Sequence, residues 1–114
     1  MKPVTAAQVE RFADMFAAMG TEARLRIVRL LLAAHPEGMV AGDIQAELQI
    51  PASTLSHHLD KLRNEGLVKV RRESTFLWYT ANTDALAEIL SFLYAECCTR
   101  SNAIPHEQIV QIRK

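Results

Sequence analysis

Two adjacent cysteines, Cys97 and Cys98, are the only thiols in this chain of 114 residues. A disulfide between neighbouring residues closes a strained small ring, so the pair is a poor structural crosslink. Thiolates are, in contrast, the ligands that soft metal and metalloid centres prefer over carboxylate or imidazole. We therefore expect two free thiols with a chemical role, in a protein of a reducing compartment.

A second group of chemically interesting residues lies on one predicted helix, residues 52–65. Its apolar stripe is Leu55, Leu59 and Leu62, and with 100° per residue the opposite face is polar. Short hydroxyl side chains at the N-terminal end of such a helix suit entry into the DNA major groove, where that end contacts base edges. A polar face exposed only to solvent is the alternative. The outward and flanking candidates for DNA contact are Ser53, Thr54, Ser56, His57 and Lys61.

Cations gather near this helix although the whole chain is neutral, with 13 Lys and Arg against 13 Asp and Glu. Zero net charge argues against a uniformly basic nucleic-acid binder. Residues 57–72, however, contain five Lys and Arg residues and only two acids, Asp60 and Glu65. A local positive patch can neutralise DNA phosphates, and we expect Asp60 to pair with a neighbouring cation or to accept a hydrogen bond from a cytosine. The patch adds Arg63, Arg71 and Arg72 to the predicted DNA contacts and also contains Lys69.

The predicted elements follow one another as four helices, a β-hairpin and a final helix. Apolar periodicity, Thr21 as a helix cap, Gly66 at a helix end and a turn around Ser74 set their limits. This order predicts a mainly α fold with a small β-hairpin, a winged helix-turn-helix (α-α-α-α-β-β-α) forming a single domain over residues 1–114. The expected ranges are 5–18, 21–34, 43–48, 52–65, 67–73, 75–81 and 83 to at least 96.

Three sequence segments resemble the ArsR/SmtB family of metalloregulatory repressors. They are Ser53-Thr54-Leu55-Ser56-His57-His58-Leu59, then Glu65-Gly66-Leu67-Val68, and upstream Arg24-Leu25-Arg26-Ile27. The resemblance covers about residues 5–98 and implies a homodimer formed by the first and last helices. It also implies that operator DNA is bound without any cofactor and is released when a metal or metalloid inducer binds.

The apolar stripes of the two end helices agree with a homodimer, since they are wider than one intramolecular contact needs. We expect dimerisation helices at about 5–19 and 83–98, followed by a short C-terminal tail. Two recognition helices related by a twofold axis would then meet major grooves about 34 Å apart. The expected interface residues are Phe12, Met15, Phe16, Leu86, Ile89, Leu90 and Leu93.

The resemblance also limits where an inducer could bind. Many members bind arsenic through cysteines at the start of the third helix, but residues 39–43 carry no cysteine here, so that site is absent. Other members bind zinc through Asp and His along the last helix, where this chain has only Asp84, so that site is absent too. Cys97 and Cys98 remain, similar to members whose arsenic site lies near the C-terminus. The third cysteine usual in that pattern is missing, since Ser101, Asn102, Ala103 and Ile104 follow.

Two thiolates match a trivalent arsenical that already carries one carbon substituent, such as methylarsenite, because arsenite offers three positions to thiolates. Arsenite with water or a buffer thiol as third ligand, antimonite, and a thiol-redox response stay open, as does zinc with His106, which lacks a fourth ligand. Adjacent helical residues project about 100° apart, so we expect the last helical turn to unwind when both sulfurs bind one centre.

Other function classes are disfavoured. The four glycines are scattered, so no loop can cradle a phosphate, and Ser, His and acid residues have no recognisable catalytic order, so we predict no enzyme. No apolar run approaches the roughly 18 residues of a membrane helix, and the N-terminal pattern is amphipathic, so we expect a cytoplasmic protein that binds no membrane. His58 is expected to turn toward the core, and Trp78 to pack rather than stack on bases.

Overall fold

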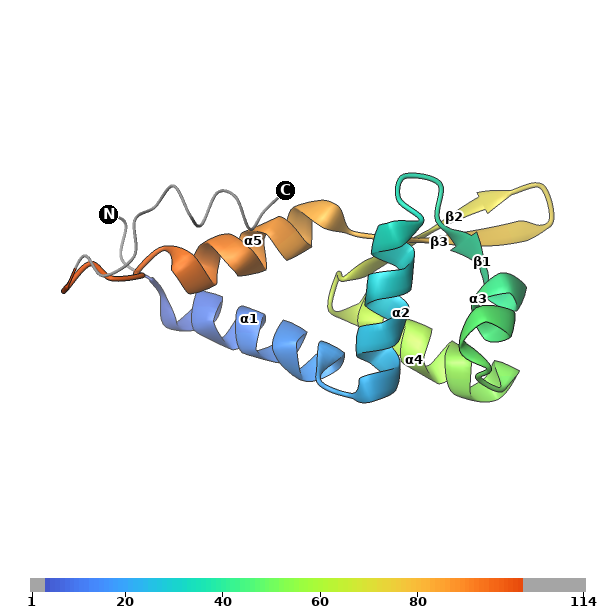
Figure 1. The fold of residues 1–114 in the computed structure, drawn as a ribbon, viewed down its shortest axis with the longest axis horizontal. Coiled ribbons are helices and arrows are strands. Elements are labelled where there is room, and N and C mark those ends of the chain that lie inside the picture. Colours follow the sequence, from blue (N-terminus) through green and yellow to red (C-terminus); the bar gives the residue numbers. More distant parts are fainter. Residues whose placement is uncertain (1–3, 102–114) are drawn as a thin grey trace. The chain divides into compact units, whose positions relative to one another are not determined.

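The structure, a computed structural model, describes residues 4–101, which divide after Asn82 into two compact units. In that range the order of elements is the predicted one, with one short strand in addition (Figure 1). Their bounds are α1 Ala6–Met19, α2 Glu22–Ala33, β1 Met39–Val40, α3 Ala41–Leu48, α4 Ala52–Asn64, β2 Val68–Glu73, β3 Phe76–Ala81 and α5 Thr83–Tyr94.

Local hydrogen bonds explain where the first helices begin. Thr5 and Gln8 form a capping box before α1, with each side chain accepting from the other residue's backbone N–H at 3.1 and 2.9 Å. Thr21 caps α2 as predicted, because its hydroxyl accepts from the backbone N–H of Arg24 at 3.2 Å. After α4 the chain turns at Gly66, whose φ of +74° is the left-handed conformation that glycine adopts without strain.

The core of the first unit lies where α2, α3 and α4 meet the start of the hairpin. α4 packs against α1, α2, α3 and β2, and the leucine stripe predicted to face inward is at most 2% exposed. This packing aligns α3 and α4 as a helix-turn-helix joined through Gln49, which has φ +54°. The most deeply buried side chains are Met15, Ile27, Leu31, Ile44, Leu55, Leu59, Leu62 and Leu67.

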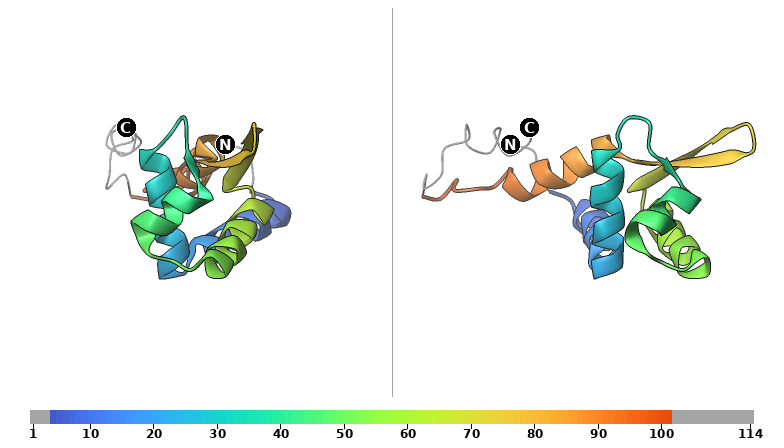
Figure 2. Two further views of the ribbon diagram at one scale, coloured as in Figure 1. Left: turned by 90° about the vertical axis from the view of Figure 1, so that its right-hand side faces the viewer. Right: turned by 45° about the vertical axis from the view of Figure 1, so that its right-hand side comes forward.

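The hairpin of β2 and β3 pairs from Val68 opposite Ala81 to Glu73 opposite Phe76, and it extends away from the helices of the unit (Figure 2). Ser74 has φ +58° in the connecting turn, which confirms the predicted turn position. β1 was not predicted and pairs antiparallel with β3, giving the sheet order β1-β3-β2. A strand of two residues has no alternation that a sequence pattern could reveal.

α5, the only helix described in the second unit, is shorter than predicted. It ends at Tyr94, whereas the sequence suggested a helix to at least Glu96 and dimerisation contacts to about residue 98. Past Ala95 the backbone bonds three residues back, from Cys97 N to Tyr94 O at 2.8 Å, and Cys98 takes φ +61°. Such turns end an α-helix, so both cysteines lie in turns.

Among the described residues, none of the helices combines the length and apolarity that crossing a membrane requires.

Replacing Gly38 by alanine should destabilise the protein by about 2 kcal/mol or more, because a left-handed backbone and an overpacked site both cost free energy. Gly38 has φ +82°, and a Cβ there would clash with the Tyr79 carbonyl oxygen. Urea unfolding measures the change. Gly42→Ala is the control, since nothing lies within 4 Å of its Cβ position in α3, and it should stabilise by about 0.5–1 kcal/mol. Equal stability of Gly38→Ala and the wild type would show that the close approach to β3 is absent.

Candidate nucleic-acid interface and thiol site

α4 presents a continuous polar face to solvent. Its N-cap residue is Pro51, which has no side-chain acceptor, so the backbone N–H groups of the first turn have no side-chain cap. Such groups and the positive end of the helix dipole attract anions. All six predicted contact residues of this helix are exposed, namely Ser53, Thr54, Ser56, His57, Lys61 and Arg63.

Asp60, the acid on this polar face, has a cation close by. Its carboxylate lies 3.9 Å from an Arg63 guanidinium nitrogen, which bears out one of the pairings expected from the sequence. Both side chains are well exposed, so the pair contributes little to stability. It does offset part of the negative charge that Asp60 would present to a phosphate.

The two predicted wing arginines have different surroundings. Arg71 donates to the carbonyl oxygen of Glu37 at 3.0 Å and to the carboxylate of Glu73 at 3.3 Å, and its guanidinium lies 5.4 Å from the centre of the half-buried Trp78 ring. The Arg72 side chain is exposed, and no described residue forms a hydrogen bond or ion pair with its guanidinium. Arg71 therefore ties the wing to the loop before β1, while Arg72 can reach a ligand.

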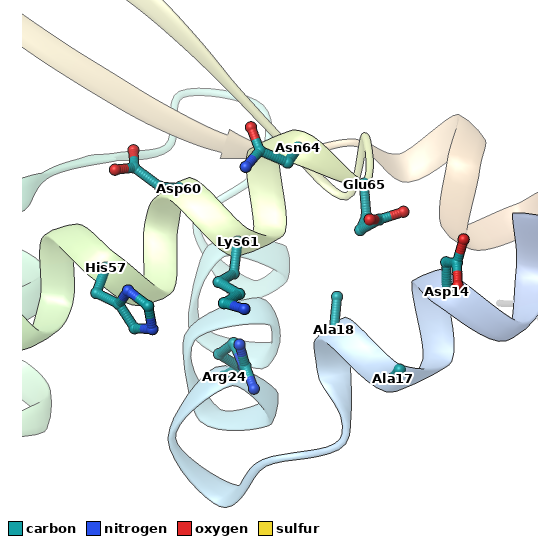
Figure 3. Close-up of a pocket in the computed structure, with 9 residues that line it drawn as sticks. All are labelled: Asp14, Ala17, Ala18, Arg24, His57, Asp60, Lys61, Asn64 and Glu65. Atoms are coloured by element: carbon teal, nitrogen blue, oxygen red, sulfur yellow. The ribbon is translucent and has the colours of Figure 1, made fainter.

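A polar pocket of about 430 Å³ opens between α1, α2 and α4 (Figure 3). Arg24 and Lys61 extend toward one another from α2 and α4 across it, and His57 lies beside them. Arg24 was not predicted as a site residue, although its spacing of three from the cap residue Thr21 is visible in the sequence. The pocket is lined by Asp14, Ala17, Ala18, Arg24, His57, Asp60, Lys61, Asn64 and Glu65.

His58 turns toward the core, as expected, and is half-buried. Its Nδ1 is buried without a hydrogen-bond partner among the described residues. Burial lowers the pKa of His58 from its ordinary value, and the positive charge of Arg24 and the neighbouring His57 lower it further. The ring is therefore held in its neutral form near neutral pH.

Cys97 and Cys98 are both half-buried free cysteines with their sulfurs 2.6 Å apart. The hydrogen bond between the two thiols raises the pKa of Cys97, with further contributions from burial and from the charge of Cys98. The left-handed backbone at Cys98 takes this residue off the helical path, so the 100° separation expected for helical neighbours does not apply. The expectation that both cysteines are helical is thus wrong: α5 has already ended, and no helical turn has to unwind on inducer binding to bring the sulfurs together.

The residues predicted for a dimer interface differ in their exposure within the single chain. Phe12 and Met15 are 6% and 1% exposed, so little of their surface is available to a partner. Phe16 and Leu93 are 37% and 53% exposed. On α5, Ile89 is buried and the remaining predicted residues, Leu86 and Leu90, are half-buried.

Within residues 4–101, no three side chains of His, Cys, Asp or Glu gather closely enough to hold a metal ion. His106, considered as a zinc ligand with the two cysteines, lies outside the described residues. The described part of the thiol site therefore offers two sulfur ligands.

Comparison with known proteins relates this geometry to transcriptional regulators. Residues 19–71 match a family described as a helix-turn-helix domain. An uncharacterized HTH-type transcriptional regulator of Methanocaldococcus jannaschii, MJ1325, is 38% identical over 74% of this chain and 92% of its own length. Proteins named as transcriptional repressors also match, among them an SmtB homolog of Synechocystis.

Solved structures share the fold. Reduced HlyU from Vibrio cholerae is 32% identical, with a TM-score of 0.62 over 82% of this chain and 95% of that one; HlyU is named a transcriptional activator. The homodimeric winged helix-turn-helix DNA-binding domain of Mb0332 from Mycobacterium bovis, a possible ArsR-family regulator, is 25% identical, with a TM-score of 0.64 over 93% and 95%. The predicted winged helix-turn-helix fold is confirmed.

Acidification should destabilise the protein partly through His58. Its pKa is lower in the folded chain than in the unfolded chain, so its contribution to stability is complete above the ordinary pKa of about 6.5 and is lost as the pH falls through the lower folded value. Urea unfolding of the wild type and of His58→Gln between pH 8 and pH 5.5 should show a smaller pH dependence in the variant. His35→Gln, which removes an exposed histidine, is the control. A variant as pH-dependent as the wild type would contradict this role of His58.

Proposed function

Because the chain belongs to the ArsR/SmtB family of winged helix-turn-helix transcriptional repressors, we propose that it binds operator DNA as a homodimer and leaves the DNA when a trivalent arsenical binds Cys97 and Cys98. The observation that carries the arsenical part is the convergence of the two sulfurs, 2.6 Å apart, just after α5. A monosubstituted organoarsenical such as methylarsenite is the proposed inducer.

The polar face of α4 supplies the proposed base and phosphate contacts. Ser53, Thr54, Ser56 and His57 are exposed on the first turns of the helix, the end that meets base edges in a helix-turn-helix complex. Lys61, Arg63 and the wing residue Arg72 are exposed cations suited to phosphates. If each protomer contacts three to five phosphates, affinity should fall about 10³- to 10⁵-fold between 50 and 200 mM salt.

The proposed dimer uses the exposed apolar surface of α1 and α5. Phe16 and Leu93 are the predicted interface residues with the most accessible side chains, and Val9 of α1 is 49% exposed. Apolar side chains of this size gain free energy when a second copy removes them from water. The relative Mb0332 is homodimeric by its own description, which supports the same assembly for this chain.

The proposed inducer reaction balances with two thiols. Cys97 and Cys98 each form one sulfur–arsenic bond, both hydroxyls of the monosubstituted arsenous acid leave, and the two thiol protons complete two water molecules. No oxidant or reductant is consumed, and the carbon substituent stays on arsenic. Thiolates suit such a soft centre.

The thiol turn directly follows α5, so a crosslink between the two sulfurs constrains the backbone at the end of a proposed dimerisation helix. This replaces the unwinding mechanism, because the sulfurs already converge without a helix at that position. A coupling of about 1–3 kcal/mol between the thiol site and the DNA-binding face would weaken operator binding roughly 5- to 150-fold.

Arg72→Gln should weaken DNA binding and lower the slope of log affinity against log salt by about 0.9 for each lost phosphate contact, or about 1.8 per dimer. Fluorescence anisotropy with an operator selected from a random duplex pool measures both quantities. Arg71→Gln is the matched comparison: its guanidinium is held by Glu37 and Glu73, so this variant should lose about 1 kcal/mol of stability instead. An unchanged salt slope for Arg72→Gln would exclude the wing contact.

Cys97→Ser and Cys98→Ser proteins should bind the operator like the wild type but stay bound when arsenicals are added, because one thiolate cannot hold the centre. DNA-release titrations of the wild type compare methylarsenite, phenylarsenite, arsenite, antimonite and zinc. The two organoarsenicals should release the operator at the lowest concentrations. Ser101→Ala, at an exposed neighbouring hydroxyl, is the control and should respond like the wild type.

Arsenical release of both cysteine variants would refute the inducer site. Release of the wild type by peroxide without any response to arsenicals would favour the thiol-redox alternative, and mass spectrometry separates the two. The arsenical adduct adds mass, whereas a disulfide removes two hydrogens.

A further inference from the structure

We infer that Arg24 and Lys61 form a clamp for one phosphate of the operator backbone, with Thr21 as the residue that positions the arginine. The inference rests on the proposed DNA binding and adds α2 to the DNA contact surface. It concerns the cationic end of the pocket between α1, α2 and α4 (Figure 3).

Arg24 is oriented before any ligand arrives. The Thr21 hydroxyl oxygen accepts from the backbone N–H of Arg24 at 3.2 Å and from its Nε at 3.1 Å. The two terminal guanidinium nitrogens have no acceptor among the described residues. A guanidinium held in this way presents its remaining N–H groups as a fork, the geometry that matches two oxygens of one phosphate.

Lys61 supplies the second cation from the facing helix. Both side chains line the same pocket and point toward one another. Among the described residues, neither forms an ion pair with a carboxylate. The positive charge of Arg24 also lies close enough to α4 to lower the pKa of His58, although burial is the larger cause of that shift. Two converging cations without an anion repel each other, and a shared anion between them relieves this repulsion.

The position of the pair favours a DNA phosphate as that anion. A helix about 10–12 Å across nearly fills a major groove about 12 Å wide, so side chains on its flanks meet the phosphate walls. Lys61 lies on such a flank of α4 beside His57, and Arg24 reaches the same point from α2. Asp14 and Glu65 lie at the other end of the pocket, toward α1, which limits the phosphate to the end with Arg24. Asp60 also lines the pocket, but its carboxylate points away from Lys61 and Arg24 and lies 3.9 Å from an Arg63 nitrogen.

The test compares Arg24→Gln with Arg29→Gln, which removes the same charge from an exposed position on another face of α2. Affinity is measured by anisotropy from 50 to 300 mM salt, on a selected operator and on random duplex. Arg24→Gln should weaken both duplexes about tenfold or more and lower the salt slope by about 1.8 per dimer, leaving the specificity ratio unchanged. Arg29→Gln should change the slope much less.

Two further variants separate charge from geometry. Arg24→Lys and Thr21→Val keep the positive charge, so both should keep the salt slope. Both should still lose affinity, because Arg24→Lys removes the guanidinium fork and Thr21→Val removes the hydroxyl that positions it. Arg24→Gln combined with Lys61→Gln should cost less than the sum of the single changes, since both residues share one phosphate. Unfolding curves and dimer mass identify any variant that fails to fold, and Lys61→Gln then replaces Arg24→Gln in the comparison with Arg29→Gln.

A slope change for Arg24→Gln no larger than that for Arg29→Gln would overturn the clamp, as would full additivity of the Arg24 and Lys61 changes. These results are distinct from failure of the proposed function. Wild-type protein that binds the operator but ignores arsenicals contradicts the inducer site alone, whereas wild-type protein that binds no duplex contradicts the DNA binding on which the clamp rests.

Discussion

The rotation of α4 about its own axis is the constraint on which the candidate DNA surface depends. Leu55, Leu59 and Leu62 are buried to at least 98%, and α4 packs against α1, α2, α3 and β2. Truncating one such leucine to alanine typically costs about 2–5 kcal/mol. The free-energy cost of a rotation that exposed all three leucines would therefore be comparable with the whole stability of a small domain. With the stripe held inward, the opposite face must be the polar one.

The same packing explains how residues far apart in the sequence come together. α2 borders α4 in the core, so the first turn of α2 brings Arg24 to the flank that carries Lys61. The turn before β1 places the Glu37 carbonyl against Arg71 of β2. One cation of the wing is therefore structural and its neighbour Arg72 is accessible, a distinction that arises from contacts between segments 34 residues apart.

The sequence was a good guide where one physical rule acts over a short range. Periodicity identified the helices, threonine and glycine marked their ends, and the leucine spacing of α4 predicted its buried face. β1 was missed because two residues show no periodicity, and its strand pairing is decided by Tyr79 and Trp78 far along the chain. The end of α5 was placed too late because apolar periodicity continues past Tyr94 while the backbone turns, with Cys98 left-handed.

For the candidate sites, the sequence predicted which residues take part better than it predicted the contacts that these residues make. The pair of cysteines could be recognised directly, and so could the cationic segment around α4. That both sulfurs converge without unwinding, that Arg71 is occupied and that Arg24 is held by Thr21 depend on backbone conformation and tertiary contacts. Charge and spacing alone do not determine such contacts, since several partners lie within reach of each long side chain.

The decisive measurement is a phenylarsenite titration of the complex with fluorescently labelled operator, in which anisotropy follows DNA release and arsenic X-ray absorption on the same samples identifies the atoms bound to arsenic. We expect DNA release to be complete at one arsenical per protomer, with two sulfur neighbours and one carbon around each bound arsenic. Release with fewer than two sulfurs around arsenic, or full occupancy of two sulfurs with the operator still bound, would contradict this expectation.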